Sequence, residues 1–340
     1  MTSKERYLAA LRGEDRDRVP VTPIFMAWAA DHVGRTYRDF YLDGDVLVEA
    51  QLAVVRLLGI DQISAISDPW RESAAYGMEF DYPADGVGAP RGHLLASPQD
   101  VAKLGPVDFA AAERTRQRIE SVAKMADAVG PTHSVLGWVE GPIAQYGDLR
   151  GVQEAMMDLI ESPDAFDQAA EVIVANAVEF ARLQVEAGAD IIGVGDAAAS
   201  LIGPQLYREH VLPWERKLID GVHEAGGLVK LHICGNITGL LADVVTTRAD
   251  VIDLDWMVPI DLARQVMGPD VCLCGNFDPS EVLLRGSAES VAAAARACIE
   301  AGGDRFILQP GCEVPPGTPE QNLRAFCPCE GCLIEEALGR

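Results

Sequence analysis

The sequence predicts an α/β protein of the (β/α)8 barrel class, built as a single domain over residues 1–340. Short apolar runs alternate with longer segments of helical periodicity, which is the pattern of parallel strands joined by crossover helices. No repeat of fixed period, low-complexity tract or linker marks a second domain, and single α/β barrels of this length are common. The eight expected strands lie at residues 21–25, 60–66, 134–142 with its loop, 191–196, 227–234, 251–255, 271–276 and 305–309.

The helices between these strands have recognisable beginnings and ends. Thr2 and Glu5 have the spacing of a capping box, so we expect a helix over residues 2–11. Apolar residues recur at helical spacing over 45–58, and Gly59 ends that helix. Further helices are expected at 109–129, at about 164–187 and at 204–225. Residues 72–99 are rich in Gly, Pro and Asp, so we expect a long loop over the barrel mouth with room for a small hairpin.

The charge balance excludes several kinds of partner. The chain has 52 acidic and 28 basic residues and a formal charge of −24, whereas nucleic-acid and anionic membrane surfaces are bound by clustered Lys and Arg. No apolar stretch approaches the roughly 20 residues that span a bilayer, and the first residues do not read as a signal peptide. We therefore expect a cytoplasmic protein. Its eight Cys favour thiols, metal ligands or catalysis over a disulfide framework.

Polar residues recur where the expected strands end. They are Asp68, Glu140, Asp196, His232 with Cys234, Asp255, Asn276 and Cys312. In a barrel the carboxyl ends of all strands share one face, and that face carries the active site. A single Asp at such a position is also a common helix cap, so each carboxylate keeps a structural alternative.

Three of these residues have the chemistry of a metal site. His232 and Cys234 are two residues apart on the fifth strand, so their side chains point to one face. The pair alone is equally consistent with a packed thiol beside a hydrogen-bonded imidazole. Cys312, after the eighth strand, supplies a third donor at the same mouth. One His and two Cys predict zinc with one open position, as in catalytic sites.

Several stretches of the chain, from about residue 3 to its end, resemble the uroporphyrinogen decarboxylase superfamily. They are Arg18-Val19-Pro20-Val21, Ser67-Asp68, Gly137-Trp138-Val139-Glu140-Gly141-Pro142, Gly195-Asp196, Gly275-Asn276-Phe277-Asp278-Pro279 and Pro316-Gly317-Thr318-Pro319-Glu320-Gln321-Asn322. This resemblance implies a (β/α)8 barrel. The superfamily contains true decarboxylases and corrinoid-dependent methyltransferases, and the chain has to be assigned to one of them.

The decarboxylase branch is the alternative assignment. Its members carry an Arg-Gln-Ala-Gly-Arg segment near the N-terminus that holds propionates, and residues 27–35 of this chain lack it. They also have a serine where this chain has Ala197 and a histidine where it has Cys312. Asp68 matches their central aspartate. A highly carboxylated tetrapyrrole needs many basic contacts, whereas this mouth reads as acidic.

The methyltransferase branch has a His-x-Cys after strand five and a Cys after strand eight, which bind zinc. The resemblance therefore implies zinc at His232, Cys234 and Cys312, and a methyl group moving between a small substrate and a cobamide. The chain lacks an Asp-x-His-x-x-Gly motif, so the cobamide is expected on a separate corrinoid protein. A thiol, a methoxy compound and a methylamine all remain open as substrates, as do the direction of transfer and the oligomeric state.

The other candidate residues have less specific signals. Asp68, Glu140 and Asp196 are candidate catalytic groups, as a proton donor, a fourth zinc ligand or structural caps, with Glu140 preferred as the ligand or as support for one. Asn236, Asn276 and Trp138 are candidates for holding substrate. Cys327, Cys329 and Cys332 fall within six residues and could hold a second zinc or be incidental. A zinc module without catalysis is a third reading, which a closed four-ligand site would favour.

Overall fold

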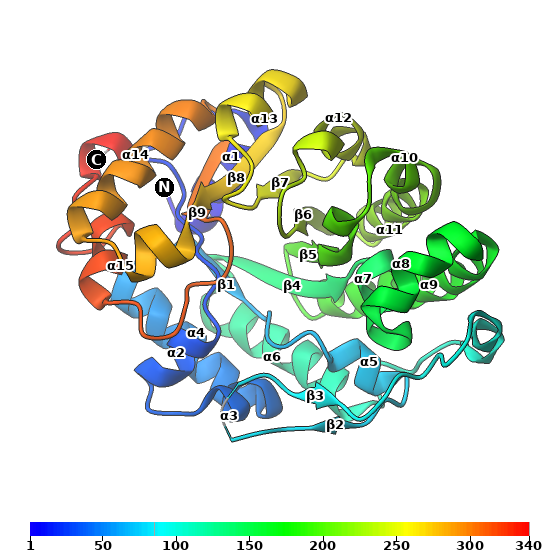
Figure 1. Ribbon diagram of the computed structural model, residues 1–340. Helices are drawn as coiled ribbons and strands as arrows, with labels where there is room; N and C mark the ends of the chain where they lie inside the picture. Colours follow the sequence, from blue (N-terminus) through cyan, green and yellow to red (C-terminus); the bar gives the residue numbers. More distant parts are fainter. Residues whose placement is uncertain (85, 340) are drawn as a thin grey trace.

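The computed structural model describes residues 1–84 and 86–339, and shows a curled parallel sheet surrounded by helices (Figure 1). The sheet has seven strands in the order β1-β4-β5-β6-β7-β8-β9. They are β1 (Gln62–Ser64), β4 (Ser134–Glu140), β5 (Ile191–Gly195), β6 (Leu228–Ile233), β7 (Val251–Leu254), β8 (Cys272–Phe277) and β9 (Phe306–Pro310). All neighbouring pairs are parallel, as the alternation of strands and helices predicts.

The helices lie on the outside of the sheet, and the expected ones are present. They are α1 (Ser3–Arg12), α2 (Ala27–His32), α3 (Tyr37–Leu42), α4 (Gly44–Leu58), α5 (Arg71–Ala75), α6 (Glu113–Val129), α7 (Pro142–Arg150), α8 (Val152–Glu161), α9 (Pro163–Glu186), α10 (Pro204–Leu206), α11 (Leu212–Glu224), α12 (Leu241–Val244), α13 (Ile260–Met267), α14 (Ala288–Gly302), α15 (Glu320–Phe326) and α16 (Glu335–Leu338). The capping box of Thr2 and Glu5 is formed, and Gly59 ends α4 with a φ of 64°.

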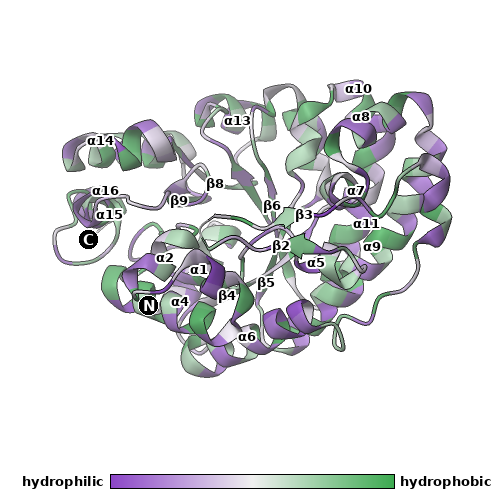
Figure 2. Cartoon of the chain, turned by 60° about the horizontal axis from the view of Figure 1, so that its bottom comes forward, coloured by the Kyte–Doolittle hydropathy of each residue, from purple (hydrophilic) through white to green (hydrophobic). Residues whose placement is uncertain are grey.

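Figure 2 shows that outer helices such as α6, α9 and α14 carry both hydrophobic and hydrophilic residues. This distribution fits helices with one face on the sheet and another toward solvent. Among the described residues, no helix combines the length and apolar composition that crossing a bilayer requires.

The expected first strand differs from the prediction, and the sheet has seven strands instead of eight. Residues 21–25 form only an isolated bridge between Val21 and Leu308. The segment still contacts both edges of the sheet, because Thr22 N–H donates to Leu308 at 3.0 Å and Asp61 N–H donates to Val21 at 2.9 Å. Pro20 and Pro23 lack the backbone N–H that a strand would use for pairing, which explains the short bridge.

The loop over the mouth contains the small hairpin that its composition allowed. Its strands, β2 (Phe80–Asp81) and β3 (Ala89–Pro90), pair antiparallel, and residue 85 between them lies outside the described residues. At the opposite end of the barrel, Tyr7 and Ala10 of α1 pack against inward residues of the sheet, Cys272 and Cys274 among them. Both thiols are buried. Because α1 covers the amino ends of the strands, the candidate site residues at their carboxyl ends lie at the end of the barrel opposite to α1.

Candidate metal centre and active-site cavity

His232, Cys234 and Cys312 meet at the carboxyl end of the sheet. His232 lies on β6, Cys234 directly follows that strand, and Cys312 follows β9. Their ligand atoms all lie within 4.8 Å of one another, and His232 Nε2 is 3.0 Å from Cys234 Sγ. The convergence predicted from strands that are not neighbours is therefore confirmed.

The three donors fit a zinc ion in chemical type and in their distances from one another. Zinc binds imidazole nitrogen and thiolate sulfur at roughly 2.0–2.3 Å, so ligands of one ion must approach each other as closely as these do. Hydrogen bonding with Cys234 lowers the pKa of the Cys312 thiol to about 5; burial opposes this shift and His232 adds to it. A thiolate, which is the form that binds metal, is therefore favoured at Cys312.

The buried carboxylate of Asp253 lies near Nδ1 of the His232 ring. Asp253 of β7 places Oδ2 3.4 Å from His232 Nδ1 and 3.2 Å from Lys230 Nζ. Gln309 donates from Nε2 to Asp253 Oδ1 at 2.6 Å and accepts from Lys230 Nζ at 2.7 Å. A carboxylate near Nδ1 favours the tautomer that carries its proton on that nitrogen, which leaves the lone pair of Nε2 free for a metal. His232 thus has the outer partner typical of metal-binding histidines.

The metal donors open onto a cavity of about 190 Å³. Its walls are largely apolar, with carboxyl groups from three parts of the chain. The lining residues are Ile24, Met26, Ile66, Ser67, Asp68, Pro69, Trp138, Glu140, Gly195, Ala197, His232, Cys234, Cys312 and Glu313. Asp68, Glu140 and Trp138 are therefore placed beside the metal donors, whereas Asp196, Asn236 and Asn276 are not part of the lining.

Glu140, at the end of β4, is a buried carboxyl on the cavity wall. Its Oε1 accepts a hydrogen bond from Trp138 Nε1 at 3.0 Å, and its backbone N–H donates to Glu72 Oε1 at 3.1 Å. Burial raises the pKa of Glu140 well above its ordinary value, and the neighbouring Glu72 and Asp148 raise it further. Such surroundings favour the protonated, uncharged form of this carboxyl.

Trp138 is positioned by two glycines on the neighbouring strand. A Cβ atom on Gly193 would lie 2.2 Å from Cε3 of Trp138, and one on Gly195 would lie 2.5 Å from Cζ2. The indole ring therefore lies flat against a stretch of β5 that has no side chains. This close approach explains the Gly-x-Gly spacing in the strand.

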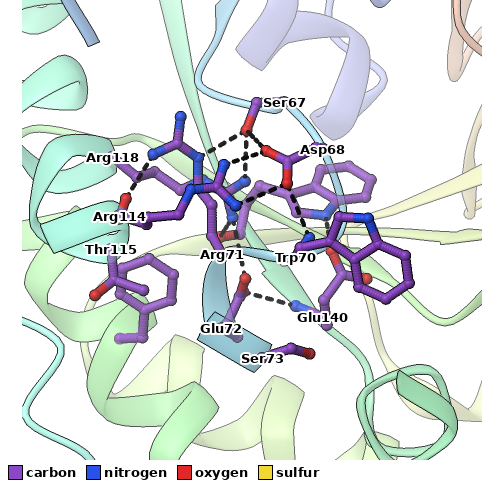
Figure 3. A network of polar contacts seen from close by, with 12 residues as sticks. Ser67, Asp68, Trp70, Arg71, Glu72, Ser73, Arg114, Thr115, Arg118 and Glu140 are labelled. Carbon is purple, nitrogen blue, oxygen red and sulfur yellow. Dashed lines mark hydrogen bonds and ion pairs between the residues drawn. The ribbon is translucent and has the colours of Figure 1, made fainter. Parts of the chain in front are cut away.

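Asp68 lies at the same mouth and is held by Arg114 of α6. The guanidinium makes two hydrogen bonds to the carboxylate, at 2.6 and 2.9 Å (Figure 3). Burial alone would raise the pKa of Asp68, but the hydrogen bonds from Arg114 and the charges of Arg114, Arg71 and Arg118 together outweigh it and hold the pKa below its ordinary value. Asp68 is thus an ionised carboxylate, whereas the surroundings of Glu140 favour its protonated form.

Two further arginines near Asp68 were not predicted as site residues. Figure 3 shows Arg71 and Arg118 converging on Ser67, whose Oγ accepts from both, at 2.7 and 3.3 Å. Both side chains are fully buried, and Arg118 also lies 3.5 Å from Glu72. The acidic lining expected from the sequence is present, but it is backed by these guanidinium groups.

Glu313 was also missed, although it directly follows Cys312. It lines the cavity, accepts from the backbone N–H of Ala27 at 3.1 Å, and has a pKa that burial raises to about 7. Sequence signals existed for some of the missed groups. Glu313 adjoins a predicted ligand, and Lys230 precedes His232 by two residues and so shares its strand face. No local pattern marks the three arginines.

The contacts of Asp196 are those of a residue that holds a helix in place. Its Oδ1 accepts from the backbone N–H of Ala144 in the first turn of α7 at 2.7 Å, which is the capping alternative. Burial and the neighbouring Glu215 raise the pKa of Asp196 well above its ordinary value, and Glu215 is hydrogen-bonded by Tyr207. Its backbone N–H donates to His232 at 2.9 Å. A catalytic role for Asp196 stays a prediction.

The two asparagines make contacts within loops. Asn236 accepts from the N–H of Thr238 at 3.0 Å, and Asn276 donates from Nδ2 to the carbonyls of Asp255 and Val258. Both contacts hold the backbone of loops at the mouth. A contact between either residue and substrate stays a prediction.

The cysteines near the C-terminus do not form a second metal cluster. In the part of the chain that the structure describes, His232, Cys234 and Cys312 are the one group of three His, Cys, Asp or Glu donors that close within 4.8 Å. Cys327 is buried, and Cys329 lies 3.9 Å from Arg324 Nη1. The metal assignment therefore concerns one site.

The fold and this site agree with what the chain is similar to. It belongs to the uroporphyrinogen decarboxylase (URO-D) family, whose profile matches residues 2–329. It is 27% identical over 334 residues to the methylcobamide:CoM methyltransferase MtaA of Methanosarcina barkeri, with 96% of each chain covered. It is also 29% identical to the uroporphyrinogen decarboxylase of Crocosphaera subtropica, covering 94% of this chain and 93% of that one. A solved methyltransferase from Methanosarcina mazei, 27% identical, superposes with a TM-score of 0.88 over 96% of this chain and 97% of the other.

Proposed function

We propose that this chain, as a single domain, is a zinc-dependent methyltransferase that moves a methyl group between a small substrate and a cobamide on a separate corrinoid protein. We propose a thiol as the substrate, before a methoxy compound or a methylamine, because one relative, 28% identical, is named a methylated-thiol–coenzyme M methyltransferase. The observation that carries this proposal is the group of one imidazole and two thiols opening directly onto a cavity. A purely structural zinc site would have four protein ligands and no access.

His232, Cys234 and Cys312 would hold the zinc ion. When bound there, zinc would lower the pKa of a coordinated thiol and keep its sulfur nucleophilic near neutral pH. Transfer to the thiol breaks the carbon–cobalt bond, whose electron pair stays on cobalt as cobalt(I), while a sulfur lone pair forms the new bond to carbon. The thiol proton has to leave the cavity.

The residues of the cavity wall have distinct tasks in this reaction. Glu140 Oε2 would accept the thiol proton when the carboxyl is ionised, since Oε1 is already engaged by Trp138, and the raised pKa would then hold that proton on Glu140. Asp68, ionised and fixed by Arg114, would set the charge of the opposite wall. Ile24, Met26 and Ile66 would exclude water from the sulfur.

The decarboxylase alternative fits the site less well. Uroporphyrinogen carries eight carboxylates, whereas the described lining of the cavity contains no Lys or Arg and encloses only about 190 Å³. Arg71, Arg114 and Arg118 lie nearby, but their groups are engaged by Ser67, Asp68, Glu72 and backbone carbonyls.

Metal content and methyl transfer test the proposal together. Purified protein should hold about one zinc per chain, and with methylcobalamin and a panel of small thiols its absorption spectrum should report loss of the methyl–cobalt bond. Cys234→Ala and Cys312→Ala should lose both zinc and turnover. Cys298→Ala removes a buried thiol of α14 outside the metal group and should keep both. A Cys312→Ala variant with full zinc and full rate would refute the assignment.

A further inference from the structure

The charge of the cavity wall restricts which thiol can enter, if the proposed methyl transfer is correct. Two of its three carboxyl groups lack a cationic partner. Asp68 is paired with Arg114, whereas no ion pair to Glu140 or Glu313 occurs among the described residues. The single hydrogen bond to each of these two carboxyls that the structure shows comes from a neutral donor, the indole of Trp138 or the backbone N–H of Ala27.

The nearby guanidinium groups cannot supply the missing positive charge. Arg71 donates to Ser67 Oγ and to the carbonyls of Arg114 and Tyr41, and Arg118 donates to Trp138 O and Ser67 Oγ. Both are fully buried, lie next to Ser67 and Asp68 (Figure 3) and are not part of the cavity lining. Turning one of them into the cavity would leave a buried carboxylate or carbonyls without partners.

The outer approach to the cavity does not change this balance. Glu313 also lines a second cavity of about 470 Å³, together with Asp31, Arg35 and residues of α3 and the β2–β3 loop. That lining holds two carboxyl groups and one guanidinium. Arg35 is exposed and lines this second cavity, but it is not part of the lining of the cavity that holds the metal donors.

We infer that the substrate is a small thiol whose remaining part is uncharged or cationic, and that thiols carrying a sulfonate or carboxylate are rejected. A sulfonate cannot be neutralised by protonation, and the described lining of this cavity offers it no Lys or Arg side chain. Burying an anion without a cationic side chain to pair with it is unfavourable. A hydroxyl or ammonium group could instead be bound by the same carboxyls. Although a relative is named for coenzyme M, a sulfonated thiol, this chain would use it poorly.

Three thiols of equal length test this inference: 2-mercaptoethanol, cysteamine and coenzyme M are neutral, cationic and anionic two-carbon thiols. With methylcobalamin as the methyl donor at one fixed pH, we expect kcat/KM for at least one of the first two to exceed that for coenzyme M by roughly tenfold or more. Titration of the cobalt(II)-substituted protein with each thiol, followed by the sulfur-to-cobalt absorption band, should give the same order in Kd. Equal or better use of coenzyme M would overturn the inference while leaving the methyltransferase proposal intact.

Two variants connect the selectivity to the cavity wall. Glu313→Gln keeps an oxygen for the Ala27 N–H and removes the charge, and Met26→Lys adds an ammonium group to the lining. Both should narrow the preference against coenzyme M several-fold, whereas Glu320→Gln, an exposed position on α15, should leave the ratio as it is. An unchanged ratio in both cavity variants would refute the role of wall charge. If no thiol of the series is methylated by the wild type, the proposed function itself fails.

Discussion

Replacing Asp253 by Asn should weaken metal binding although Asp253 is not a ligand. Gln309 Nε2 donates to Asp253 Oδ1 at 2.6 Å, so the remaining oxygen of the Asn side chain would be kept on that side. Its NH2 group would then face Lys230 Nζ and His232 Nδ1, which lie 3.2 and 3.4 Å from Asp253 Oδ2 and both need an acceptor. The imidazole would relieve the conflict by moving its proton to Nε2, the atom that should bind the metal.

The size of the effect follows from the loss of one outer partner. Such substitutions reduce metal affinity by about 10- to 100-fold, equivalent to about 1.4 to 2.8 kcal/mol. Transfer of zinc to a chromophoric chelator at fixed pH would measure it. The cobalt(II)-substituted variant should retain the absorption of two thiolate ligands, because Cys234 and Cys312 are unchanged.

A matched control separates this effect from general destabilisation. Asp250→Asn alters a carboxyl just before the same strand, where it accepts from Val229 N–H and contacts His223. It should lower the thermal midpoint without changing zinc affinity. If Asp253→Asn held zinc within twofold of wild type, the orientation of His232 by Asp253 would be refuted.

Three further outcomes are expected. Uroporphyrinogen incubated anaerobically with the protein should remain intact, and formation of coproporphyrinogen at enzymatic rates would overturn the choice of branch. Gly193→Ala should lower the unfolding free energy by about 1–3 kcal/mol in denaturant titrations, because its Cβ would meet the ring of Trp138; an unaffected midpoint would contradict that packing. The raised pKa of Glu140 means that folding favours its protonated form, so its contribution to stability is complete below about pH 4.5 and is lost as pH rises through the folded-state pKa. Glu140→Gln should therefore show a smaller fall in thermal midpoint between pH 5 and pH 8 than wild type, and an identical fall would refute the assigned burial.

The parts of the fold that were predictable are those with local signals. The apolar runs placed seven of the eight expected strands, and the Thr2–Glu5 capping box placed α1, because side-chain periodicity and caps act over a few residues. The segment after Pro20 was expected as a strand from its apolar residues. The number of residues that pair as a strand depends on backbone N–H donors, and Pro20 and Pro23 have none.

The candidate site also contains residues that local sequence signals predicted and residues that they did not. The metal donors were found because His-x-Cys and Cys312 both mark strand ends, and strand ends converge in any barrel. Asp196 has the same kind of position, yet its carboxylate points to the first turn of α7. The direction of the Asp196 side chain depends on α7, which packs beside it, and a position at the end of a strand does not predict that packing. The pairing of Asp68 with Arg114 joins distant segments and required the folded chain.

The metal donors come from two strands that are not neighbours, β6 and β9, with β7, β8 and their helices between them in sequence. Zinc at this position would act as a staple across the sheet, formed only after the last third of the chain has folded into place. Zinc binding would thus indicate that the chain has folded completely, because neither His232 with Cys234 nor Cys312 alone provides enough ligands to retain the ion. The hydrogen bonds of Gln309 to Lys230 and Asp253 already connect β9 to β6 and β7 beneath the metal position. Zinc would therefore bind to strands that these hydrogen bonds already hold together.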